Sequence, residues 1–147
     1  MEMTKIYAAT AMDETAQLHV WRSKFFDKSA KCEAELKRLS ASPADAKLHF
    51  KVMAEKLLTT SKNNKLKVAK DEALIRLIEE LVPLIELRAE LAHSHFINSA
   101  NQDHGLAMLK NANFFHVHFD RITVLSAEQR KKAYDRLASI AGQLAKL

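Results

Sequence analysis

The sequence has little of the residues that build turns and covalent crosslinks: one cysteine, two glycines and two prolines among 147 residues. A single thiol, Cys32, excludes a disulfide within the chain and a zinc site made of several cysteines, and it suits a reducing compartment. Tight turns need glycine and proline most, so their scarcity argues against a fold of many short strands. The composition therefore favours a mainly helical chain.

Long apolar runs are absent as well. None approaches the roughly 20 residues that a membrane-spanning helix requires. Residues Met1–Lys5 also lack the apolar core of a signal peptide. We therefore expect a cytoplasmic protein without a membrane partner, folded as one domain over residues 1–147. The net charge of +5 permits an anionic partner such as RNA without requiring one.

Apolar residues recur at three- and four-residue steps in four stretches, which predicts four helices. The first runs from about residue 10 or 13 to Leu39. The second begins at Ser42, which can cap a helix that has Pro43 in its first turn, and a loop follows it over residues 59–64. The third reaches from about residues 68–71 to His95, and the fourth follows Ser126.

Three local features refine this expectation. Pro83 lies inside the third helix, where it removes one backbone donor, so we expect a kink or two abutting helices there. Residues 106–110 and 114–125 are predicted to be extended, as a small β-hairpin joined at residues 111–113. Ser126 and Gln129 form a capping box at the start of the last helix. The simplest arrangement is an up-and-down bundle of about four helices with the hairpin before its last helix.

The segment Leu84–Ser94 holds the candidate functional residues. At roughly 100° per residue, Arg88 falls in the middle of the apolar arc of the third helix. A guanidinium in that position is costly unless it is paired or faces a partner or a cleft. His93 falls roughly 140° away on the same wheel, near Glu86 and Glu90. His93 can turn toward Arg88 only if the helix ends or loosens before it.

The run Arg88-Ala89-Glu90-Leu91-Ala92-His93 resembles the R-x4-6-H motif of HEPN domains, near the end of a long helix in a helical bundle. With the helical layout, the resemblance covers about residues 10–147. Ala89 stands where active members commonly carry Asn, Asp or His. The resemblance implies a homodimer in which the motifs of both subunits meet, and a metal-independent endoribonuclease of toxin or defence type that needs no cofactor.

The same resemblance implies roles for the four residues. His93 would be the general acid or base at the RNA 2′-hydroxyl or the leaving oxygen. Arg88 would stabilise the charge that develops on the phosphate. Glu86 or Glu90 would orient His93 from the helix face.

Two alternatives stay open at this point. In a non-catalytic dimerising or regulatory module, Arg88 extends along its stem or pairs with a carboxylate, and His93 caps the end of the helix. In a metal-binding protein, imidazoles supply the ligands. The candidate metal ligands are two His-x-His pairs: His93, His95, His116 and His118.

Overall fold

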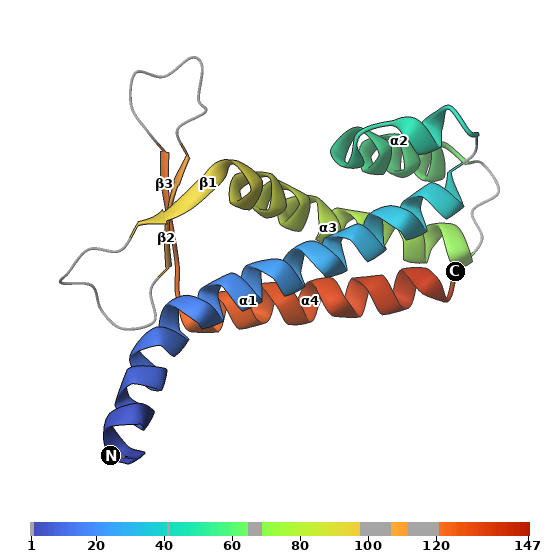
Figure 1. The fold of residues 1–147 in the computed structure, drawn as a ribbon. Coiled ribbons are helices and arrows are strands. Elements are labelled where there is room, and N and C mark those ends of the chain that lie inside the picture. Colours follow the sequence, from blue (N-terminus) through green and yellow to red (C-terminus); the bar gives the residue numbers. More distant parts are fainter. Residues whose placement is uncertain (1, 41, 65–68, 98–106, 112–120) are drawn as a thin grey trace.

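The computed structural model describes residues 2–40, 42–64, 69–97, 107–111 and 121–147, with side chains for 16–40, 42–64, 70–93 and 125–147. The chain is mainly helical, as predicted. Within the described part, four α-helices pack as a bundle, and a small sheet lies at one end (Figure 1). The helices are α1 (Glu2–Leu39), α2 (Phe50–Asn63), α3 (Ala69–His93) and α4 (Ala127–Ala145).

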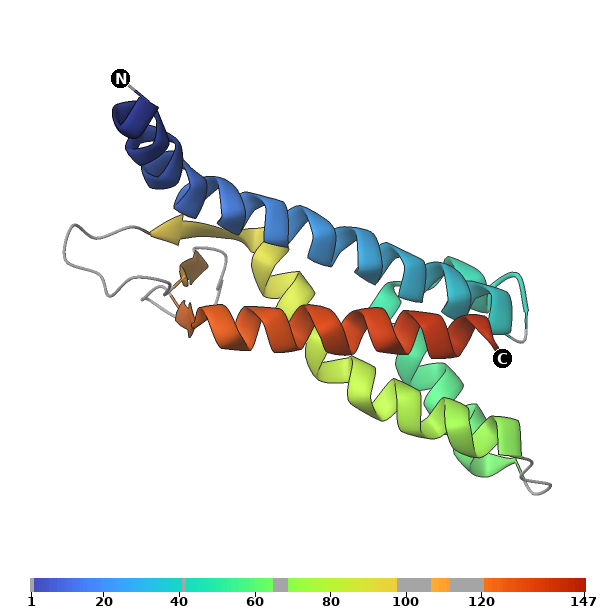
Figure 2. The same cartoon turned by 90° about the horizontal axis from the view of Figure 1, so that it is seen from below.

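Helices α1 and α4 run side by side in the same direction, as Figures 1 and 2 show. Three hydrogen bonds from side chains of α1 to carbonyls of α4 follow this order. They are Trp21 Nε1 to Arg130 at 2.8 Å, Cys32 Sγ to Leu137 at 3.8 Å, and Arg38 Nη2 to Leu144 at 3.1 Å. In an up-and-down four-helix bundle, the first and last helices run in opposite directions. The predicted up-and-down order is therefore wrong, although the bundle itself is present.

The reason lies between α1 and α2. The second helix does not begin at Ser42: the chain forms a turn, a short 3₁₀-helix η1 (Asp45–Lys47) and an extended residue before α2 begins. The Ser42 hydroxyl does accept a backbone N–H, from Asp45 at 3.2 Å, but it caps this turn. The segment brings α2 back beside the middle of α3, where the ion pairs Lys51–Glu86 and Lys62–Glu79 join the two antiparallel helices.

The ends of the other helices test the remaining predictions. α2 continues to Asn63, so the predicted loop over residues 59–64 is wrong for all but its last residue. α3 passes through Pro83 as one helix, which excludes the prediction of two abutting helices. α4 begins as predicted: Gln129 N donates to Ser126 Oγ at 3.1 Å, and Ser126 N donates to Gln129 Oε1 at 2.8 Å.

Three short strands connect α3 to α4. They are β1 (Ser94–Ile97), β2 (Ala107–Asn111) and β3 (Arg121–Leu125), paired antiparallel in the order β1-β2-β3. The structure has this three-stranded sheet in place of the predicted two-stranded hairpin. The register pairs Asn111 with Arg121, which rules out a tight connection at residues 111–113, and predicted strand residues 114–120 lie outside the described part. Residues 94–95, expected to be helical, belong to β1.

The core lies where the four helices meet. α1 supplies the predicted apolar stripe, and α3 supplies the largest share of buried side chains. This agrees with the apolar arc predicted for the third helix. Among the described residues, no helix has the length and apolarity to cross a bilayer. The fully buried large side chains are Phe25, Leu36, Met53, Leu77, Ile78, Leu81, Leu91, Leu137, Ile140 and Leu144.

Candidate functional site

Arg88 lies on the core-facing side of α3, as the helical wheel predicts. Leu84 and Leu91, one turn away on either side, are buried, and Arg88 itself is half-buried. Its guanidinium carbon lies 5.8 Å from the centre of the Phe26 ring on α1. Within the described part of the chain, no hydrogen bond or ion pair to its guanidinium is found. An arginine stacked on a ring keeps its N–H groups, which lie in the guanidinium plane, available to an anion.

Phe26 receives a second guanidinium, from its own helix. Arg22 precedes Phe26 by one turn of α1, and its guanidinium carbon lies 5.5 Å from the ring centre. Arg22 Nη2 also donates to the carbonyl of Leu91 at 2.6 Å. That carbonyl belongs to the last turn of α3, where backbone acceptors lack partners within the helix. Arg22 therefore ties α1 to the end of α3 and brings a second positive charge beside Arg88.

His93 is the last residue of α3, and its side chain is exposed. Because the helix continues to His93, the side chain does not turn back toward Arg88. The two residues are separated by about 140° around the helix axis and roughly 7.5 Å along it, from ideal helix geometry. The chain therefore presents Arg88 and His93 on different faces of α3, and no contact between them is found among the described side chains.

The two glutamates take different positions. Glu86 is exposed and forms an ion pair with Lys51 of α2, with Nζ and Oε1 3.4 Å apart. This contact directs its carboxylate toward α2, away from the predicted role of orienting His93. Glu90 is half-buried, one turn before the end of α3. Its burial close to His93 keeps it as the better candidate for that role.

The predicted metal ligands fall mostly outside what the structure describes. His116 and His118 lie in residues 112–120, and the side chain of His95 on β1 is not described. Among the described side chains, no group of three or more His, Cys, Asp or Glu residues is placed to hold a metal ion. His19 on α1 and His49, which precedes α2, are both exposed.

Sequence reasoning missed the residues of other elements that surround Arg88. Besides Arg22 and Phe26, these are the side chains of the segment before α2, which line a cavity of about 430 Å³ with Arg88. The spacing within α3 carries no information on which residues of other helices approach it.

No family model, curated protein or solved structure matches the chain. What the site can do is therefore argued from its own chemistry. It combines a half-buried guanidinium with free donors, a fixed helix end and an exposed imidazole five residues further on. Guanidinium and imidazole groups are suited to bind a phosphate and to move a proton at neutral pH.

Proposed function

We propose that the chain is a HEPN-like RNA-binding protein that acts as a homodimer and cleaves RNA without a metal ion. The single observation that carries the proposal is the position of Arg88. Its guanidinium sits in the apolar face of α3, stacked on Phe26, and has no ion pair within the described residues. A structural arginine in such a position is normally paired with a carboxylate. An unpaired one is suited to an anionic ligand.

In the proposed reaction, the 2′-oxygen of a ribose attacks the adjacent phosphorus, and the bond from phosphorus to the 5′-oxygen breaks. The products are a 2′,3′-cyclic phosphate and a 5′-hydroxyl. His93 takes the proton from the 2′-hydroxyl or gives one to the leaving 5′-oxygen, because a ring nitrogen of imidazole can accept or donate a proton. Arg88 donates to the phosphate oxygens as negative charge develops on them.

The dimer follows from the separation of the two residues. Within one subunit, Arg88 and His93 point to different faces of α3, so a single subunit does not bring both to one phosphate. A second copy related by a two-fold axis presents the same two groups in the opposite order. The exposed end of α3, with the small side chains of Ala89 and Ala92 beside His93, permits close approach of another helix.

The first test is cleavage of a single-stranded RNA by the purified wild-type protein in EDTA, with the 2′,3′-cyclic phosphate as the diagnostic product. We expect Arg88→Ala and His93→Ala to lower the rate by about 100-fold or more, which is typical of removing a general acid–base group or an oxyanion donor. Lys131→Ala, an exposed change on α4, is the control for surface charge.

The result that contradicts catalysis is wild-type protein that binds RNA in EDTA and leaves it intact. That outcome would favour the non-catalytic dimerising module, which Ala89 also fits, since active HEPN domains commonly have a polar residue at that position. Equal cleavage by wild type and both variants would assign the activity to a contaminant.

A further inference from the structure

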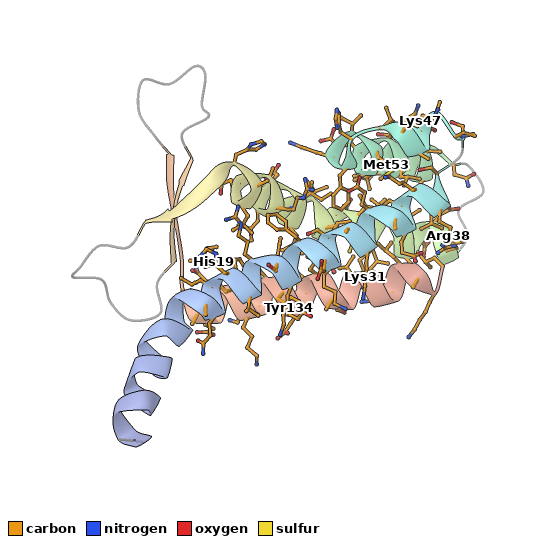
Figure 3. The ribbon with its side chains drawn as sticks, viewed as in Figure 1. His19, Lys31, Arg38, Lys47, Met53 and Tyr134 are labelled. Atoms are coloured by element: carbon orange, nitrogen blue, oxygen red, sulfur yellow. The ribbon has the colours of Figure 1, made fainter. Side chains whose placement is uncertain are left out.

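A cavity opens between α1, the segment before α2, and α3. It has a volume of about 430 Å³, and its walls include Phe50 and Ile85 from the core. Lys47, which Figure 3 labels on the segment joining α1 to α2, lies at its edge. The charged and titratable side chains that line it are Glu33, Lys37, Lys47, His49, Lys51 and Arg88.

The charges in this cavity are unbalanced. Four cationic side chains face one carboxylate, so the lining carries an excess of three positive charges with His49 neutral. Lys37 is 3.5 Å from Glu33, and Lys51 is 3.4 Å from Glu86 outside the cavity. The lysine of each pair is exposed, and ion pairs near the surface contribute little. Lys47 and Arg88 have no ion pair within the part of the chain that the structure describes.

The N-terminus of α2 opens into the same cavity. His49 is the N-cap, and its side chain accepts no hydrogen bond from the first turn. The first turn also contains no acidic residue. The leading backbone N–H groups of a helix have no acceptor within it and carry a partial positive charge. Here the partial positive charge of these N–H groups adds to the charges of the lysines and Arg88. A Ser, Asp or Asn at the N-cap would have accepted a hydrogen bond from one of these N–H groups.

We propose that this cavity binds a phosphate group, held by Lys47, Lys51, Arg88 and the first turn of α2. A phosphate oxygen matches both the paired donors of a guanidinium and the N–H groups of a helix start. The site shares Arg88 with the proposed nuclease but does not need cleavage to occur. It lies on the α2 side of α3 and is not lined by His93 of the same subunit, so phosphate binding there does not depend on His93.

The test compares two double variants that remove the same charge. Lys47→Gln with Lys51→Gln alters the cavity, and Lys131→Gln with Lys132→Gln alters exposed residues of α4. Pyrophosphate is titrated into each protein at low ionic strength, where charge effects are least screened, and affinity is measured by calorimetry. We expect at least about a tenfold loss of affinity in the cavity variant and less than about twofold in the α4 variant.

Amide resonances identify the site and the source of the phosphate. On adding pyrophosphate, we expect the largest shifts at Phe50 and Lys51, in the first turn of α2. A mononucleotide and a short single-stranded RNA are then titrated in parallel. The ligand that produces the same shifts at the lowest concentration identifies a free nucleotide or an RNA backbone as the source.

Two results would overturn the site: wild-type protein that does not bind pyrophosphate at millimolar concentration, or equal weakening in both double variants. Failure of the phosphate-site proposal can be distinguished from failure of the nuclease proposal. His93→Ala should abolish RNA cleavage while leaving pyrophosphate affinity unchanged, because His93 does not line the cavity.

Discussion

Phe26 organises the candidate site at the level of single residues. The guanidinium carbons of Arg22 and Arg88 lie 5.5 Å and 5.8 Å from the centre of its ring, and Arg22 also donates to the Leu91 carbonyl. Two like charges beside one ring are tolerated when each also faces solvent or an acceptor. The spacing within α3 placed Arg88 in the apolar arc. It did not reveal Phe26 or Arg22, because a helical wheel describes one helix and not its neighbours.

Among the described residues, Cys32 is a buried group whose titration the fold changes strongly. Its side chain is fully buried, and burial raises the pKa of the thiol from 9.0 to about 12. Between these values the unfolded chain releases the thiol proton and the folded chain keeps it, so the free energy of unfolding falls as pH rises. We predict a loss of about 1.4 kcal/mol between pH 8 and pH 10 from this group alone.

Urea unfolding of wild type and Cys32→Ala at both pH values measures this effect. The two proteins differ only at this side chain, so the difference between their pH dependences isolates the thiol. The variant should be less stable at pH 8, since Cys32 fills the core, but should lose less stability by pH 10. Identical pH dependence in the two proteins would contradict the burial of an un-ionised thiol.

At the level of elements, the start of α4 is the clearest case in which local sequence determined structure. Ser126 and Gln129 satisfy each other's backbone N–H groups, as the capping box predicts. We predict that Ser126→Ala lowers the free energy of unfolding by about 1 kcal/mol, measured by urea unfolding. Ser23→Ala, an exposed change inside α1, is the matched control and should cost nothing.

Loss of stability in Ser23→Ala equal to that in Ser126→Ala would contradict the assignment of the effect to the cap.

The region around Ser42 shows where the same rule falls short. Ser42 and Pro43 have the cap pattern, yet the capped element is a turn followed by η1, and α2 begins only at Phe50. Capping residues fix where a helical turn starts, whereas packing against α1 and α3 decides whether it continues.

The strands show a second limit of local pattern. β-branched residues indicated an extended segment before α4, and β3 is present there. The pairing partner and the register depend on contacts between segments that are distant in sequence, which no local pattern specifies. For the same reason, Ser94 and His95 were assigned to the third helix, although they begin β1.

At the scale of the whole molecule, the segment between α1 and α2 determines which residues surround Arg88, because it places the start of α2 beside α3. Because α2 begins beside the middle of α3, its N-terminus and Lys47 face the same cavity as Arg88. An up-and-down bundle would have placed α2 along a different face. The sequence therefore predicted the four α-helices of the described ranges and the most unusual residue, but not the basic cavity around that residue.

The most direct test of the account is a mixture of two inactive proteins. Arg88→Ala and His93→Ala subunits are unfolded together, refolded and assayed for RNA cleavage in EDTA. If Arg88 of one subunit acts with His93 of its partner, random pairing gives half heterodimers, each with one intact site of two, and about a quarter of the wild-type rate. No recovery in the mixture, from variants that each refold, would contradict a site shared between subunits.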